Sequence, residues 1–162
     1  MTEFQKVLPE EAAELSVFAS EIVKEHYDPI LGTKQNDYMI AMFQSPSAIR
    51  HQLEEGGRYY RLVSDGQCAG FTAFYPKKNK MYISKLYVHK DFRRKHIAKD
   101  TVAFIEEQAR CEGLKGIFLN VNKYNSGSIA AYEKMGFVNV YAEKNPIGNG
   151  YFMDDFVMEK TV

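Results

Sequence analysis

The chain has 162 residues, of which 45% are hydrophobic and 26% charged, a balance typical of one globular domain and too apolar for intrinsic disorder. Lysine plus arginine and aspartate plus glutamate both number 21, and the resulting net charge of zero argues against a dedicated nucleic-acid-binding protein. The 2 cysteines are too few for a disulfide framework, so we expect two buried or unreactive thiols. The N-terminus lacks the pattern of a signal peptide, and no apolar stretch reaches membrane-spanning length, so we expect a cytoplasmic protein with no membrane partner.

The N-terminal third is predicted to fold as one strand followed by helices. A strand is expected over residues 4–8, and Pro9 suits the first turn of a helix whose apolar residues recur at helical spacing. We expect Asp28-Pro29 to end that helix, because proline disfavours its continuation. Two shorter helices are predicted over residues 37–43 and 46–55.

The rest of the chain shows strand patterns interrupted by two helices. Residues 58–64 and 67–75 flank Asp65-Gly66, which predicts a β-hairpin, and a second turn is expected at residues 76–80. This order of elements predicts a mixed sheet with a parallel junction between the strands that begin at Met81 and Gly116. The remaining strands are expected at residues 81–89, 116–121, 137–144 and 151–160, and the helices at residues 97–112 and 126–135.

A strongly basic segment, residues 90–99, joins the strand at 81–89 to the following helix. A helix N-terminus offers unpaired N–H groups and a partial positive charge, so cations there are unfavourable unless an anion binds. The segment is therefore either a cradle for a phosphate or a solvated basic loop, and the spacing alone favours neither interpretation.

A second segment of interest surrounds the helix at residues 126–135. Asn125 is suited to cap this helix, and Tyr132 lies about two turns further along it. Gly136 is expected to end the helix, and the side chain of Phe137 to enter the core. A purely structural interpretation, in which Asn125 only caps and Tyr132 only packs, explains this segment as well.

Taken together, the two segments resemble the acetyl-CoA-binding core of the GCN5-related N-acetyltransferases (GNAT). That family has the signature Gln/Arg-x-x-Gly-x-Gly/Ala at a helix start, and here Arg93 takes the first position and Ala98 the last. The family's second block, Asn-x-x-Ala/Ser-x-x-x-Tyr-x-x-x-Gly-Phe, is filled in register by Asn125, Ser128, Tyr132, Gly136 and Phe137.

The resemblance implies a single N-acetyltransferase domain over residues 1–162, of the α/β (α+β) class. Its central sheet would be mixed and mostly antiparallel, with a splayed parallel strand pair and helices on both faces. The co-substrate would be acetyl-CoA, with no metal, and Tyr132 would be the catalytic residue that faces the thioester sulfur. The cofactor-binding residues it implies are Leu86, Tyr87, Val88, Arg93, Arg94, Lys95, His96, Ile97, Ala98, Lys99, Asn120, Asn125 and Tyr132.

Two positions depart from the family pattern. His96 replaces the first glycine of the signature, which either widens the loop or is tolerated because φ stays negative. Relatives often carry a glutamate base on the central strand, and Ser84 stands in its place, so we assign no base.

The acceptor is expected to be a primary amine, and the chain's last strand is similar to those of small bacterial acetyltransferases that act on polyamines. Asp154 and Asp155 are adjacent in this strand, so they point to opposite faces and only one can line a pocket. The acidic residues of the first helix are interpreted as a solvated face rather than part of a pocket. The alternatives are a protein or peptide amine as acceptor, or a non-catalytic acyl-CoA sensor; a homodimer fits the fold.

Overall fold

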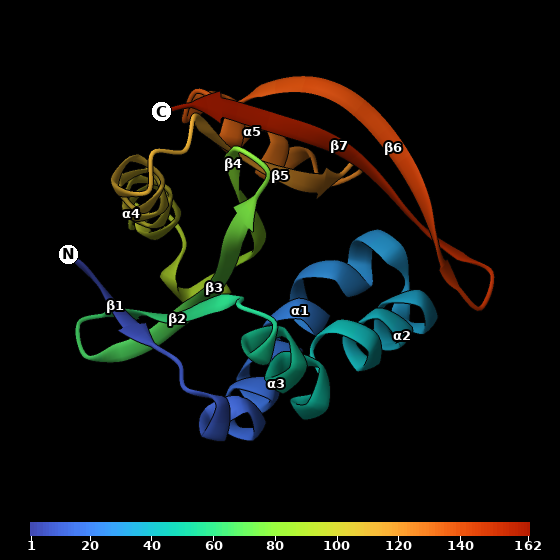
Figure 1. The fold of residues 1–162 in the computed structure, drawn as a ribbon. Helices are drawn as coiled ribbons and strands as arrows, with labels where there is room; N and C mark the ends of the chain where they lie inside the picture. Colours follow the sequence, from blue (N-terminus) through green and yellow to red (C-terminus); the bar gives the residue numbers. More distant parts are fainter. The chain divides into compact units, whose positions relative to one another are not determined.

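The computed structural model describes residues 1–162 and contains one seven-stranded sheet with strand order β1-β2-β3-β4-β5-β7-β6 (Figure 1). Strands β4 and β5 are parallel, whereas the pairs β1–β2, β2–β3, β5–β7 and β6–β7 are antiparallel. The expected mixed, mostly antiparallel sheet with one parallel pair is thereby confirmed. The chain divides into two compact units, and their boundaries pass through β3, β4 and α4. The expectation of a single domain stays a prediction.

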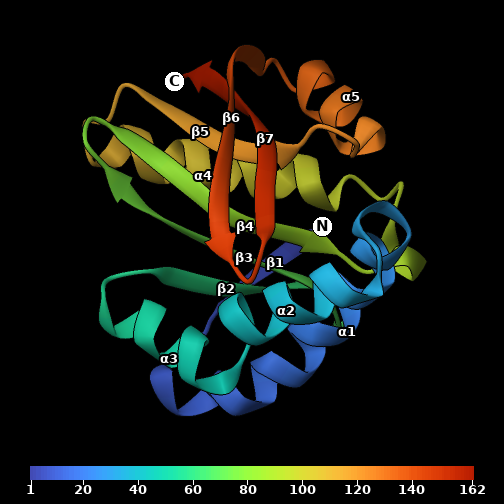
Figure 2. The same ribbon diagram turned by 90° about the vertical axis from the view of Figure 1, so that its right-hand side faces the viewer.

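The first unit comprises residues 1–75 and 85–102. Helix α1 packs against both α2 and α3, as Figure 2 shows. Its core gathers large buried side chains, among them Leu15, Ile22, Ile49, Tyr59 and Phe71. The elements that lie wholly or partly in this unit are β1 (Thr2–Lys6), a 3-10 turn (Pro9–Glu11), α1 (Ala12–Leu31), α2 (Thr33–Phe43), α3 (Pro46–Glu54), β2 (Arg58–Ser64), β3 (Gln67–Lys77), β4 (Lys80–Val88), a second 3-10 turn (Lys90–Phe92) and α4 (Ile97–Cys111).

The end of α1 differs from the sequence prediction, because Pro29 lies inside the helix rather than at its end. Proline removes only its own hydrogen bond to the preceding turn, and the next turn still closes, since the Gly32 amide donates to the Asp28 carbonyl over 3.0 Å. The Asn36 side chain reinforces this turn by donating to the Val23 carbonyl (3.2 Å) and to Asp28 Oδ1 (2.8 Å). Gly32, with a φ of 83°, then ends the helix.

The β2–β3 hairpin confirms the prediction from Asp65-Gly66. Both residues have positive φ, 52° and 77°, as a type I′ turn requires. The next turn lies within the predicted residues 76–80 but is shorter, because β3 continues through Pro76 to Lys77 and β4 begins at Lys80. Lys78, with a φ of 59°, reverses the chain there.

The second unit comprises residues 76–84 and 103–162. Its parallel β4–β5 pair aligns Tyr82 with Phe118, and β7 joins β5 on the other side. Strands β6 and β7 form a long, curved antiparallel ribbon (Figure 1). Lys160 of β7 reaches Glu106 of α4 over 2.7 Å, so α4 covers the sheet face that carries Lys160. The further elements of this unit are β5 (Gly116–Asn122), α5 (Ser126–Lys134), β6 (Val138–Gly148) and β7 (Tyr151–Thr161).

The two cysteines differ in exposure. Cys68 is half-buried, and burial raises the pKa of its thiol, so an unreactive thiol is supported there. Cys111 lies exposed at the end of α4, so of the two expected alternatives, a buried or an unreactive thiol, only the unreactive thiol is left for it, and that stays a prediction. None of the helices combines the length and the apolar composition that a membrane crossing needs.

Candidate functional site

The basic segment of the first unit enters α4 through a strained backbone. Arg94 and His96 have φ values of 65° and 61°, in the left-handed region that side chains with a Cβ rarely adopt. Of the two alternatives for His96, a wider loop or a negative φ, the negative φ is therefore wrong: the residue adopts the left-handed conformation that normally favours glycine. Such a loop turns backbone amides toward the start of the helix, the usual construction of an anion-binding turn.

In the basic segment, some side chains contact the rest of the protein and others are exposed to solvent. Ile97 is 2% exposed and fixes the start of the helix in a buried cluster. Arg93 Nη2 lies 3.1 Å from Glu25 Oε2 and 3.4 Å from His26 Nδ1, so its guanidinium is held by α1. Arg94, Lys95, His96 and Lys99 are exposed. The helix start therefore combines the N–H groups of a first helical turn with several exposed cations, which favours an anion.

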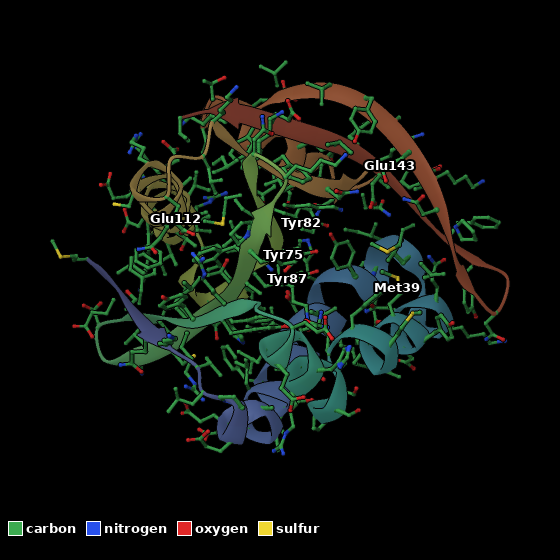
Figure 3. All side chains as sticks on the ribbon, viewed as in Figure 1. Met39, Tyr75, Tyr82, Tyr87, Glu112 and Glu143 are labelled. Carbon is green, nitrogen blue, oxygen red and sulfur yellow. The ribbon has the colours of Figure 1, made fainter.

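Residues 86–88 of β4 are held on both sides. Leu86 and Val88 pack into the same cluster as Ile97. Tyr87, labelled in Figure 3, stacks on Phe71 with ring centroids 5.3 Å apart. Strand β3 approaches this segment so closely that a Cβ on Gly70 would lie 2.1 Å from the Tyr87 carbonyl oxygen. The segment is thus fixed before any ligand arrives.

A buried lysine precedes this segment and was not anticipated from the sequence. Lys85 Nζ donates to the Phe43 carbonyl (2.6 Å), to Gln44 Oε1 (2.9 Å) and to the Tyr59 hydroxyl (2.5 Å). Burial lowers the pKa of Lys85 to about 7 and raises the pKa of Tyr59. The three acceptors match the three ammonium protons, so this lysine ties the end of α2 to β2 and β4 in the first unit.

In the second unit, α5 is capped at both ends as the sequence predicts. Asn125 is 5% exposed and its side chain accepts from the Ser128 amide over 3.4 Å. At the other end, the Phe137 amide donates to the Tyr132 carbonyl over 3.0 Å, and Gly136 has a φ of 99°, which is a Schellman motif. The side chain of Phe137 is 3% exposed, so its predicted place in the core is confirmed.

Tyr132 lies half-buried on this capped helix, with its ring 5.4 Å from that of Phe137. The edge-to-face contact restricts the ring, while the partial exposure leaves room for the phenol to meet a ligand. Its role as the catalytic residue stays a prediction.

The adjacent acids of β7 point to opposite faces, as predicted. Asp154 Oδ1 lies 2.9 Å from Lys123 Nζ. Asp155 is 4% exposed and hydrogen-bonded to the Asn120 side chain. Burial first, and then the negative charges of Glu143 and Asp154, raise the pKa of Asp155 to about 6. The alternation of the strand predicts that one of Asp154 and Asp155 faces the interior, but it does not predict which of the two is buried.

Several acids of the first helix region are engaged in local structure. Glu11 Oε1 accepts from the Leu8 amide over 2.9 Å, and Glu11 Oε2 lies 3.1 Å from Arg61. Asp28 pairs with Lys24 over 3.0 Å, and Glu25 holds Arg93. Each of these three acids is thus engaged in an ion pair, so the predicted solvated face does not describe them fully, and their absence from a pocket stays a prediction.

Comparison with known proteins adds a family to these observations. Residues 20–137 match the model of the acetyltransferase (GNAT) family. Over 56 residues the chain is 39% identical to GCN5-related N-acetyltransferase 6, chloroplastic, of Arabidopsis thaliana. The match covers 35% of this chain and 19% of that protein, so the chain spans about a fifth of this curated relative.

Solved structures with the same fold cover the whole chain. The PaiA N-acetyltransferase of Thermoplasma acidophilum, in complex with coenzyme A, has a TM-score of 0.80 and 22% identity, with 100% of this chain and 99% of that chain covered. A GCN5-related N-acetyltransferase from Rhodopseudomonas palustris has a TM-score of 0.81 and 17% identity, with coverage of 100% and 96%. The ribosomal-protein-S18-alanine N-acetyltransferase of Escherichia coli has a TM-score of 0.71 and 15% identity, with coverage of 100% and 94%. At these identities the likeness shows the fold.

Proposed function

Since the chain belongs to the GNAT acetyltransferase family, we propose that it transfers the acetyl group of acetyl-CoA to a primary amine. The observation that carries the proposal is the start of α4, where positive φ at Arg94 and His96 presents backbone amides beside exposed cations. A diphosphate is the anion for which such a turn is suited. In this proposal the amides of residues 93–99 bind the diphosphate of acetyl-CoA.

The other residues implied by the family would hold the rest of the co-substrate. The backbone of Leu86, Tyr87 and Val88 would pair with the pantetheine arm in the manner of an added strand. Asn120 and Asn125 would supply amide groups, and Tyr132 would meet the sulfur. Acetyl-CoA supplies the activated thioester, and the chain orients it.

The amine nitrogen attacks the thioester carbonyl directly, and the thiolate departs. A thiol has a pKa of about 8.5 and a tyrosine about 10, so full proton transfer from an unperturbed Tyr132 is uphill by roughly 2 kcal/mol. Tyr132 therefore stabilises the departing thiolate by donating a hydrogen bond. Loss of this donor is expected to lower kcat about 100-fold.

We further propose a small cationic amine as the acceptor rather than a protein amine. The half-buried Glu143 and the buried Asp155 share one sheet face in the second unit, and negative charge there favours a cation. A cytoplasmic location, inferred from the sequence, and a homodimer remain parts of this proposal.

The test is release of CoA from acetyl-CoA, followed with a thiol reagent, across polyamines, amino sugars, amino acids and peptides. Amine-dependent release is expected, highest with small cationic amines. Tyr132→Phe should lose most of kcat and keep its affinity for CoA, while Tyr124→Phe, at a tyrosine that is 73% exposed, should match the wild type. Tight CoA binding without release for any amine would contradict the proposal and favour an acyl-CoA sensor.

A further inference from the structure

One sheet face of the second unit carries a set of polar side chains that no catalytic role yet uses. Register places Tyr82 of β4 opposite Phe118 of β5, and Asn122 of β5 opposite Asp155 of β7. Asp155 in turn lies opposite Glu143 of β6. Paired residues share a face, so these side chains point to the same side of the four strands, as Figure 3 shows for Tyr82 and Glu143.

Asp155 differs from the other residues on this face because its carboxyl group is buried and few neighbouring groups stabilise a negative charge on it. It is 4% exposed, and the interaction that favours its charged form is the hydrogen bond to Asn120. Its charged neighbours are Glu143 on β6 and Asp154 on its own strand, and both are acidic. Lys123, which follows β5, is paired with Asp154 on the opposite face.

Buried carboxylates are normally paired with cations, because burial alone disfavours the charge. A carboxyl group kept in place among other acids, with one amide to orient it, is typical of a group that binds protons in the course of a reaction.

We propose that Asp155 is the general base of the acetyl transfer and accepts the proton that the attacking amine nitrogen loses. This inference rests on the proposed function. It supplies the base that Ser84, in the position of the family's usual glutamate, cannot provide.

The protons and bonds balance as follows. The ammonium form of the substrate first loses one proton to solvent, and the neutral amine attacks the thioester carbon. As the C–N bond forms, the nitrogen becomes cationic and acidic, and the Asp155 carboxylate takes its proton. The C–S bond then breaks, the thiolate becomes a thiol by taking up one proton from Asp155 or solvent, and the carboxylate is restored. The products are the N-acetyl amine, CoA thiol and one solvent proton.

The electrostatics suit this role. A base works best when its pKa lies near the working pH, and the pKa of Asp155 is raised to about 6. The carboxyl group is therefore mostly ionised at neutral pH, yet is more basic than an exposed aspartate. Glu143 contributes to this shift, so Glu143 is a positioning residue that acts through Asp155.

The test is the pH profile of kcat/KM for the amine at saturating acetyl-CoA, from about pH 5 to pH 8. Amine protonation alone gives log kcat/KM a slope of one in this range. In the wild type we expect a second unit of slope below about pH 6, where Asp155 becomes protonated. Asp155→Asn should remove that extra slope and lower kcat 100-fold or more at neutral pH, with unchanged CoA affinity.

Three further variants separate a base from a structural role. Asp155→Glu should restore part of kcat and the extra slope, and Glu143→Gln should move the break to lower pH. Glu107→Gln, at an exposed acid of α4 that does not act on Asp155, should keep the wild-type kcat. If Asp155→Asn keeps both kcat and the extra slope while the wild type turns over, this inference is wrong and the proposed function stands. If the wild type releases no CoA with any amine, both fail.

Discussion

Replacing Lys85 with methionine is expected to change how the stability of the protein depends on pH. The ammonium group of Lys85 is buried, and its pKa is lowered from 10.5 to about 7. Between these two values the unfolded chain binds one more proton than the folded chain. The free energy of unfolding of the wild type therefore rises with pH across this window.

The magnitude follows from the two pKa values. Linkage gives at most about 1.4 kcal/mol per pH unit, so Lys85 should add about 2 kcal/mol of stability between pH 7 and pH 9. The methionine in Lys85→Met does not titrate, so the free energy of unfolding of this variant should lack the rise that Lys85 causes between pH 7 and pH 9. Other titrating groups contribute equally to both proteins and cancel in the difference.

The assay is urea unfolding of both proteins at about pH 7, 8 and 9, with Lys34→Met at an exposed position of the same unit as the matched control. The difference in free energy of unfolding between wild type and Lys85→Met should grow with pH, while the control should follow the wild type. Parallel curves for wild type and Lys85→Met, within about 0.5 kcal/mol, would refute the assignment of a buried, easily deprotonated lysine.

The other predictions concern Gly70, His96 and Asp155. Gly70→Ala should cost about 2–3 kcal/mol by urea unfolding, because its Cβ would lie 2.1 Å from the Tyr87 carbonyl oxygen, whereas Gly127→Ala, in open space, should be neutral or stabilising. His96→Gly should raise stability by about 0.5–1 kcal/mol, because a φ of 61° strains a histidine but suits glycine; an equal gain from Lys95→Gly would contradict this cause. Asp155→Asn should be stabilised by about 2 kcal/mol at pH 7 but little at pH 4, because a raised pKa means that stability is lost as pH rises from 3.8 to about 6. If the difference in free energy of unfolding between the wild type and Asp155→Asn did not change with pH, burial of Asp155 would not disfavour its charged form.

Local signals in the sequence were sufficient where one short segment decides its own structure. Asp65-Gly66 determines a hairpin turn, and Asn125 and Gly136 determine the two ends of α5, because each acts through backbone geometry within a few residues. The end of α1 was predicted wrongly at Pro29, since a side chain from the next helix, Asn36, stabilises the extra turn.

The titration of the buried groups could not be predicted from the sequence. The strand alternation places Lys85 on the same face as Met81 and Ile83, but a lysine side chain is rarely buried, and its acceptors come from the end of α2 and from β2, which lie far away in the sequence. Asp155 could be placed on one of two faces, but its burial depends on β5 and β6. The positive φ at His96 likewise depends on Arg93 and Ile97, which anchor the loop at both ends.

A crystal structure of the protein with CoA is the most direct test of the proposed chemistry. We predict that diphosphate oxygens accept hydrogen bonds from backbone amides of residues 93–99, at about 2.9 Å, and that the CoA sulfur contacts the Tyr132 hydroxyl. A diphosphate bound away from the start of α4, or a sulfur out of reach of that hydroxyl, would contradict the proposed role of both elements.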